Sequence, residues 1–263
     1  MRKELKNRIV NKGECLFAMS ALSIIFFLIG LIAGFMSGMF GIGGGSVRIP
    51  LLNVTGLPLL TAFGINLFVI PFASGVGAIS HRKNIDRRIG LNLVVGGSLG
   101  SIVGAFLTGL IPTLMLAIIF VIISLMTIVG VYLDRIAPKL SQRISPSAKY
   151  IVSGSFCLNL ITGMRGGSGG SLFPPFLRAM HLDIHKAIAT SLFVTIFTAI
   201  AAIIIYWHRG NIFWLPALFV LIGSMIGVRV GSKLSLKTKP WWLETGLSVV
   251  IVILALLTVY KAL

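Results

Sequence analysis

Acidic side chains are scarce in this chain, which has six aspartates and glutamates among 263 residues, against 23 lysines and arginines. None of the six lies in the middle of a long apolar stretch: they are Glu4, Glu14, Asp86, Asp134, Asp183 and Glu244. Carboxylates inside a membrane span usually mark proton relays or cation sites, so the sequence shows no carboxylate site of either kind. With a formal net charge of +17, the chain favours an anionic ligand over a cationic one.

Cysteine is also rare, since Cys15 and Cys157 are the only two. Both lie in or beside apolar stretches, where cysteine usually serves as a small packing residue, and they imply neither a disulfide framework nor a metal site. His181 and His185 flank Asp183 at a spacing that suits a metal, but an ordinary loop is the simpler interpretation. The sequence therefore predicts no metal, no other cofactor and, without a nucleophile–base set, no enzyme.

Charged residues of all kinds make up only 11% of the chain, whereas 56% of the residues are hydrophobic. Soluble domains carry about 25% charged residues, and several apolar stretches here reach the roughly 20 residues that a helix needs to cross a bilayer. The predicted fold class is an all-α polytopic membrane protein that passes several times through the cell membrane. Its basic residues gather in short loops, where they set the orientation and contact lipid headgroups rather than nucleic acid.

Two glycine-rich strings, GMFGIGGGSVRIP at 38–50 and GMRGGSGGSLFPP at 163–175, indicate an internal repeat. Gly38 aligns with Gly163, an offset of 125 residues (163 − 38), and the match continues downstream without a gap. An offset of 127 residues (223 − 96) then aligns a stripe of glycines: Gly96, Gly100 and Gly104 with Gly223, Gly227 and Gly231. We interpret the chain as two homologous membrane repeats, 1–135 and 149–263, joined by a cytoplasmic linker at 136–148.

Each repeat is expected to hold four spans and one broken or re-entrant segment, at 38–50 and at 163–175. The eight predicted transmembrane helices are 16–36, 57–80, 89–110, 113–133, 148–164, 186–206, 212–232 and 242–262. The repeats then run parallel, and the basic loops 82–88 and 134–149 lie on the side of the N-terminus, as the positive-inside rule requires, although the lysines at 233–239 disagree. Counting each broken segment as a full crossing makes the repeats inverted instead.

The two strings carry the predicted binding site. Glycine lets a backbone leave helical geometry at little cost, and proline removes a hydrogen-bond donor. Non-helical backbone survives at membrane depth only where it lines a cavity or is buried by protein. Matching breaks in two halves are the pattern expected of a transporter's central site, and the N-terminus of the short helix after each string suits an anion.

The predicted substrate-binding residues come from the strings and from the helices that follow them. Glycine N–H groups and serine hydroxyls act as donors, two arginines add positive charge, and Asn66 and Ser191 occupy matching positions. The set is Gly43, Gly44, Gly45, Ser46, Arg48, Asn66, Arg165, Ser168, Gly169, Gly170, Ser171 and Ser191. Other polar side chains near the breaks suit a helix–helix hydrogen bond equally well: Asn159, Thr162, Thr190, Thr195 and Thr198.

Three other interpretations of these residues are open. The string GIGGGS also suits a nucleotide loop, although it follows a membrane helix rather than a strand. Glycine also allows close helix packing, which we prefer for the stripe at 96–104 and its partner at 223–231. Arg48 also suits a side chain that snorkels to the membrane interface, whereas Arg165 stands at the break itself.

The stretch GLIAGFMSGMFGIGGGSVRIPLL, with TAFGINLF and KAIATSLF downstream, resembles the signature of the sulfite exporter TauE/SafE family. The resemblance extends over nearly the whole chain and over both halves. It implies a secondary transporter of roughly eight membrane helices for small sulfur-containing or organic anions, such as sulfite, sulfoacetate or sulfonates. The second string and the two arginines stand outside the common pattern of the family.

We therefore expect a permease that moves a small anion across the membrane by alternating access, with membrane lipid as its other partner. A passive anion channel or a lipid-binding membrane scaffold is the alternative. The sequence leaves open the substrate, the direction of transport, the coupling ion and whether the chain forms a homo-oligomer.

Overall fold

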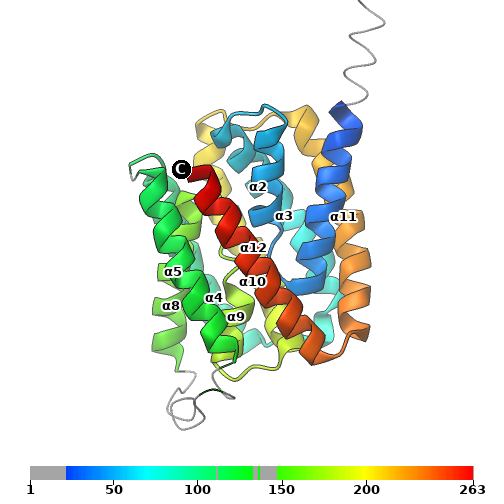
Figure 1. Ribbon diagram of the computed structural model, residues 1–263, viewed down its shortest axis with the longest axis vertical. Coiled ribbons are helices and arrows are strands. Elements are labelled where there is room, and N and C mark those ends of the chain that lie inside the picture. The colour runs from blue at the N-terminus through cyan, green and yellow to red at the C-terminus, as the bar shows by residue number, and fades with distance from the viewer. Residues whose placement is uncertain (1–21, 111, 133–135, 137–146, 263) are drawn as a thin grey trace, which may run out of the picture.

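The computed structural model describes residues 22–110, 112–132, 136 and 147–262, and the regular structure in this part of the chain is helical (Figure 1). The elements are an N-terminal helix described over Leu22–Phe40, α2 Gly45–Val54, α3 Leu59–Ser80, η1 Arg82–Asn84, α4 Arg87–Phe106, α5 Thr113–Val131, α8 Ala148–Met164, α9 Phe173–Ala179, α10 Ile184–His208, α11 Trp214–Lys237 and α12 Pro240–Ala262. The all-helical fold class is confirmed. Most of the linker predicted at 136–148 lies outside the described residues.

Five of the described helices are long and apolar enough to cross a bilayer: the N-terminal helix, α3, α4, α10 and α11. Each lies where the sequence predicts a span, with its ends shifted by a few residues. Many of their large apolar side chains face outward, among them Ile24 and Ile222, which are both more than half exposed. In a membrane these side chains face lipid, so their exposure has no cost there. The chain is a multi-pass membrane protein.

Both glycine strings interrupt the helices, as predicted. Residues 41–44 and 165–172 are not helical, and each interruption is followed by a short helix, α2 or α9. Gly44 and Gly169 hold the same left-handed conformation, each with φ of 73°, at positions that the offset of 125 residues aligns. A residue with a Cβ adopts this conformation only at a cost, so the turn after each helix depends on glycine.

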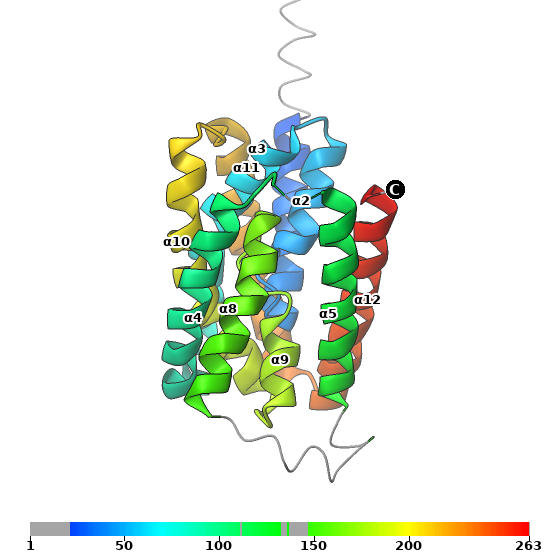
Figure 2. The ribbon, with the colours of Figure 1, turned by 90° about the vertical axis from the view of Figure 1, so that its left-hand side faces the viewer.

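The short helices reverse the direction of the chain. In Figures 1 and 2 the N-terminal helix runs from the upper end of the bundle, where the C-terminus also lies, toward the lower end, and α2 then returns upward. The next helix, α3, therefore runs downward like the N-terminal helix. In the second half α8 runs upward, α9 returns downward, and α10 runs upward. The corresponding helices of the two halves point in opposite directions.

The parallel arrangement that we favour from the loop charges is therefore wrong for this structure. In the parallel arrangement, the chain is still on the side where the preceding span ends when the short segment is complete, and the next long helix starts from that side. In the structure the segment brings the chain back to its starting side before the next long helix begins. The end of α3, the start of α4, the end of α5 and the start of α8 all lie at the lower end, opposite the start of the N-terminal helix (Figure 2).

Helices of one half pack along helices of the other. A Cβ on Gly100 of α4 would lie 2.3 Å from the carbonyl oxygen of Phe156 in α8. A Cβ on Gly227 of α11 would lie 2.2 Å from the carbonyl oxygen of Leu31 in the N-terminal helix. These two contacts correspond by the offsets of 127 and 125 residues. Each glycine stripe thus lets one backbone approach another, as the packing interpretation requires.

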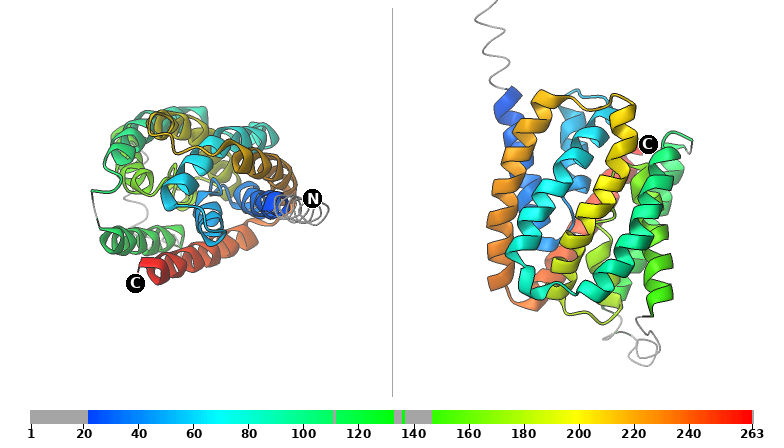
Figure 3. Two further views of the ribbon diagram at one scale, coloured as in Figure 1. Left: turned by 90° about the horizontal axis from the view of Figure 1, so that it is seen from above. Right: turned by 180° about the vertical axis from the view of Figure 1, so that it is seen from behind.

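The centre of the bundle is formed by α3 and α10, which pack against each other and are the most buried of the five long helices. Each of the two also holds the short helix of its own half, α2 against α3 and α9 against α10. Farther out, α5 and α12 run side by side at one edge, as the view from above shows (Figure 3). The two glycine strings therefore lie inside the bundle, surrounded by long helices.

Replacing Gly100 by alanine should weaken the packing of α4 on α8, because the new methyl group would meet the Phe156 carbonyl. Overpacking of this kind costs about 1–3 kcal/mol, which corresponds to a loss of about 2–4 °C in melting temperature per kcal/mol for a chain of this size. Thermal unfolding of the purified protein in detergent measures the loss. The control is Gly75→Ala in α3, where an added Cβ meets nothing within 4 Å. Equal losses in both variants would contradict the explanation.

Candidate functional site

The two glycine strings meet at the centre of the protein. A Cβ on Gly170 would lie 2.9 Å from the carbonyl oxygen of Ile42 and 3.0 Å from the Cα of Gly43. The hydroxyl of Ser191 in α10 donates a hydrogen bond of 2.7 Å to the carbonyl of Gly41. The predicted residues Gly43, Gly170 and Ser191 are thus brought together from both halves of the chain.

Arg48 is the largest side chain that the structure buries completely, with none of its surface exposed. Its Nη1 donates a hydrogen bond of 2.6 Å to the Oδ1 of Asn66, and its Nη2 donates one of 3.1 Å to the hydroxyl of Ser224. Both partners are neutral, and the Nε has no partner among the described residues. The alternative in which Arg48 snorkels to the membrane interface is therefore wrong, because the guanidinium points into the protein.

Asn66 connects this arginine to the second glycine string. While its Oδ1 accepts from Arg48, its Nδ2 donates a hydrogen bond of 2.8 Å to the carbonyl of Gly166. Gly45 lies against the same amide, since a Cβ there would be 2.6 Å from the Nδ2 atom. Non-helical backbone of one half is therefore satisfied by a side chain of the other, as buried polar groups require.

In the second half, neutral residues occupy the positions that correspond to Gly44 and Arg48. Asn159 lies against Gly169, where an added Cβ would be 2.6 Å from the amide oxygen and nitrogen. The hydroxyl of Ser101 donates a hydrogen bond of 3.0 Å to the Oδ1 of Asn159. At the position that aligns with Arg48 stands Phe173, which is fully buried. The charge that Arg48 brings to the centre therefore has no counterpart at the equivalent position of the second half.

Among the remaining predicted residues, Ser168 lies at the centre, since a Cβ on Gly43 would be 3.7 Å from its hydroxyl. Ser46 lies in the first turn of α2 and Ser171 just before α9, and neither caps a helix: the N-caps are Gly44 and Leu172, without side-chain hydrogen bonds. The carbonyl of Ser168 accepts a hydrogen bond of 3.0 Å from the Thr198 hydroxyl. Arg165 ends α8, immediately before the Gly166 carbonyl that Asn66 holds.

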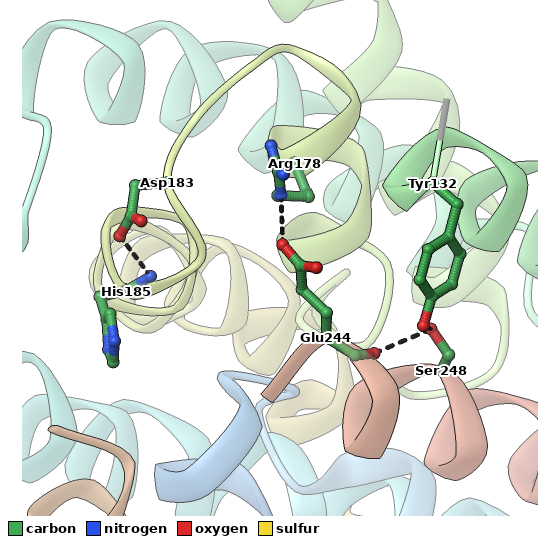
Figure 4. Close-up of polar contacts among 6 residues, drawn as sticks. All are labelled: Tyr132, Arg178, Asp183, His185, Glu244 and Ser248. Carbon is green, nitrogen blue, oxygen red and sulfur yellow. Dashed lines mark hydrogen bonds and ion pairs between the residues drawn. The ribbon is translucent and has the colours of Figure 1, made fainter. Parts of the chain in front are cut away.

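The three acidic residues in the described part of the chain have other roles. Asp86 accepts from the backbone N–H of Ile89 and so caps α4. Asp183 caps α10 in the same way, through a hydrogen bond of 2.9 Å from the backbone N–H of His185 (Figure 4). Glu244 of α12 forms an ion pair of 2.8 Å with Arg178 of α9 (Figure 4). None of the hydrogen bonds of Arg48 given above goes to a carboxylate.

Comparison with known proteins shows the family of the chain. The profile of the family described as "Sulfite exporter TauE/SafE" matches residues 26–258. The chain belongs to the TauE/SafE family. Among its relatives, "Probable membrane transporter protein YdhB" of Bacillus subtilis is 28% identical over 80% of this chain and 87% of its own length. "Probable membrane transporter protein YunE" of the same species is 25% identical over 90% of this chain and 97% of its own.

A third relative comes from Escherichia coli: "Probable membrane transporter protein YfcA" is 26% identical over 84% of each chain. No solved structure gives a significant match. These names describe membrane transporters in general terms. The substrate of this TauE/SafE protein therefore has to be argued from its own residues.

Sequence reasoning missed some partners in this TauE/SafE site. Ser224 holds Arg48 and in turn donates a hydrogen bond of 3.1 Å to the carbonyl of Gly30. Ser74 accepts one of 3.1 Å from Thr195. Both serines lie inside apolar helices, and Ser224 aligns with Gly97 in the first half, so the repeat gives no signal for it. Only the crossing of α11 with the N-terminal helix brings it to the arginine.

Replacing Asn66 by leucine should destabilise the protein, because it leaves the Nη1 of Arg48 and the Gly166 carbonyl without a partner. Each unsatisfied buried group costs about 1–3 kcal/mol, and a charged group costs more. Thermal melting in detergent measures the effect, with Asn92→Leu on the outer part of α4 as the control. Equal melting temperatures for the two variants would show that Asn66 does not hold the strings together.

Proposed function

We propose that this TauE/SafE protein is a secondary transporter that moves a small anion across the membrane by alternating access. The substrate binds between the two glycine strings, next to Arg48. The observation that carries the proposal is the burial of this guanidinium among neutral partners. The anion then meets fixed positive charge and backbone donors at the point where the two halves of the protein touch.

The energetic argument starts from the cost of burying a charge. An ionised group taken out of water without a counter-charge is strongly unfavourable, and hydrogen bonds to neutral groups offset only part of that cost. The partners of Arg48 are an amide and a hydroxyl, and its Nε is left over. A small anion supplies the missing charge and an acceptor for that nitrogen. Charge-assisted hydrogen bonds of this kind are roughly twice as strong as neutral ones.

The membrane arrangement that we propose has eight long crossing helices, and α2 and α9 each return the chain to the side on which the preceding long helix begins. The two repeats are inverted relative to each other, and inverted repeats that meet at broken helices are common in secondary transporters. The contacts of Gly100 with Phe156 and of Gly227 with Leu31, which correspond by the repeat offsets, support the duplication. Movement of one half against the other would open the site to each side in turn.

The lower end of the bundle is proposed to face the cytoplasm. Its described segments are rich in basic residues: Arg82, Lys83, Arg87, Arg88, Lys149, Lys186, Lys237 and Lys239. The described loops at the upper end, by contrast, contain Arg209 as their basic residue. Positive charge favours the cytoplasmic side. In the inverted arrangement the lysines near 233–239 agree with this rule, whereas they violate it in the parallel one.

The substrate class that we propose rests on the charge and the hydrogen-bond donors of the site. The Arg48 guanidinium, neutral hydroxyls and glycine backbone suit a compact anion with several oxygen atoms, such as sulfite, or a short organic anion such as sulfoacetate. The family description names sulfite export, and the names of the relatives specify a membrane transporter. A flux measurement distinguishes this transporter from the two alternatives, a passive anion channel and a lipid-binding scaffold without transport.

Replacing Arg48 by glutamine should lower anion transport by about one to two orders of magnitude, since the lost charge–anion interaction is worth about 1.5–3 kcal/mol. The assay uses purified protein in liposomes and measures uptake of sulfite and sulfoacetate, with phosphate and a cation as comparisons. The matched control is Arg229→Gln, which removes an exposed arginine from α11. No saturable uptake of either anion by the unmodified protein would sink the proposal, and uptake without saturation would favour a channel.

The inverted arrangement predicts that the two ends of the bundle differ in accessibility. With Cys15 and Cys157 replaced by serine, Leu110→Cys at the upper end should react with a membrane-impermeant thiol reagent in intact cells. Lys83→Cys at the lower end should react only after the cells are permeabilised. Labelling of both cysteines from the same side would contradict the proposed orientation.

A further inference from the structure

Besides the Nδ1 of the partly buried His185, four fully buried polar side chains near the lower end of the bundle have no hydrogen-bond partner for at least one of their atoms. They come from the end of the N-terminal helix, the residue after α3 and the last turns of α11: Ser37, His81, Ser232 and Ser235. Each is at most 1% exposed. Buried hydroxyls and imidazoles are almost always paired, so a group of this kind needs an explanation.

Contacts around Gly38 bring three members of this group together: Ser37, His81 and Ser232. A Cβ on Gly38, the residue after Ser37, would lie 3.0 Å from the hydroxyl of Ser232. The carbonyl of Gly38 also faces the imidazole of His81, although neither ring nitrogen makes a hydrogen bond of normal geometry. The end of α3 and the last turns of α11 therefore converge on the end of the N-terminal helix.

The repeat shows what stands at the equivalent place of the other half. The offset of 125 residues aligns His81 with Tyr206, and the offset of 127 residues aligns Ser235 with Thr108. Tyr206 and Thr108 form a hydrogen bond of 2.9 Å between their hydroxyls at the upper end. The upper pair is therefore complete, whereas the lower pair has replaced the phenol by an imidazole that can take up a proton.

We propose that His81 is a proton-binding site of the transport cycle, with the hydroxyls of Ser232 and Ser235 and the Gly38 carbonyl as its partners. It takes up a proton when the lower end opens to water and releases the proton when that end closes as in this structure. The inference rests on the proposed transport function and names its coupling ion as the proton. The described carboxylates are not available for this task, since Asp86 and Asp183 cap helices and Glu244 pairs with Arg178.

The surroundings of His81 support such a cycle. Burial lowers the pKa of its imidazole from 6.5 to about 4, with the Gly38 carbonyl acting in the opposite direction and His185 of α10 adding a small lowering effect. Arg82 and Lys83, which follow in the chain, are exposed to solvent. The N-terminal helix contributes the carbonyl and Ser37, and α11 contributes its two serines.

The sign of the effect follows from these values. A group whose pKa is lowered by burial binds fewer protons in the closed state than in a state that exposes it to water. Between pH 6.5 and about 4, a fall in pH therefore favours the open or unfolded protein. At pH 5 the shift in the equilibrium is on the order of tenfold or more.

One experiment tests this site without any substrate. The melting temperature of the full-length protein in detergent should fall as the pH is lowered from 7 to 5, and the fall should be smaller in His81→Gln. A merely structural role of His81 would lower the melting temperature equally at every pH. His208→Gln, which removes an exposed histidine, is the control. An unchanged pH dependence in His81→Gln would overturn the inference.

The second experiment measures coupling in liposomes. A pH gradient should drive accumulation of sulfoacetate or sulfite by the unmodified protein. In His81→Gln the gradient should lose its effect, while exchange of labelled for unlabelled anion continues. Gradient-driven accumulation that persists in His81→Gln would refute the coupling role. If the unmodified protein moves neither anion, the proposed function fails, and the melting experiment still decides whether His81 binds the proton.

Discussion

The burial of the Arg48 guanidinium is the constraint on which the central structure depends. Its charge lies among an asparagine, a serine and glycine-rich backbone, in a protein whose outer surface is apolar. Because such a charge is costly to bury, every group around it must be placed accurately. Asn66 accepts a hydrogen bond from the arginine and at the same time donates one to the second glycine string. The contact that satisfies the charge therefore also joins the two halves.

The glycine residues make this arrangement sterically possible. At Gly45 and Gly169 an amide side chain occupies the space that a Cβ would fill, and at Gly170 the opposing string does so. Away from the centre, the glycine stripes of α4 and α11 let whole helices of one half approach those of the other. Inside a lipid bilayer, such close helix contacts are stabilised by van der Waals packing and by hydrogen-bonded backbone groups rather than by the hydrophobic effect. The two halves are thus interlocked rather than simply adjacent.

Duplication gives the protein two similar halves, and function follows from the places where they differ. Arg48 aligns with Phe173, so the buried charge of the first half has no counterpart at that position of the second. His81 aligns with Tyr206, so a titratable ring stands at the lower end where a hydrogen-bonded phenol stands at the upper end. Arg178, paired with Glu244, aligns with Asn53, whose amide instead donates to the carbonyl of Leu57. Because the polar residues of the two inverted copies differ, the upper and lower ends of the bundle differ in their charged and titratable side chains.

Composition and periodicity were enough to determine the all-helical membrane class, the approximate position of each long helix and the two interruptions. Hydrophobic length and glycine density act locally, so they are readable in the chain itself. The direction of the second half was not readable, because it depends on whether a short helix continues or turns back, and loop charges favoured the wrong choice. Likewise, no local pattern distinguishes Ser224 or His81 from other residues of apolar helices. Their roles arise when helices distant in sequence cross, since a buried charge or an unpartnered imidazole is defined by its neighbours in space.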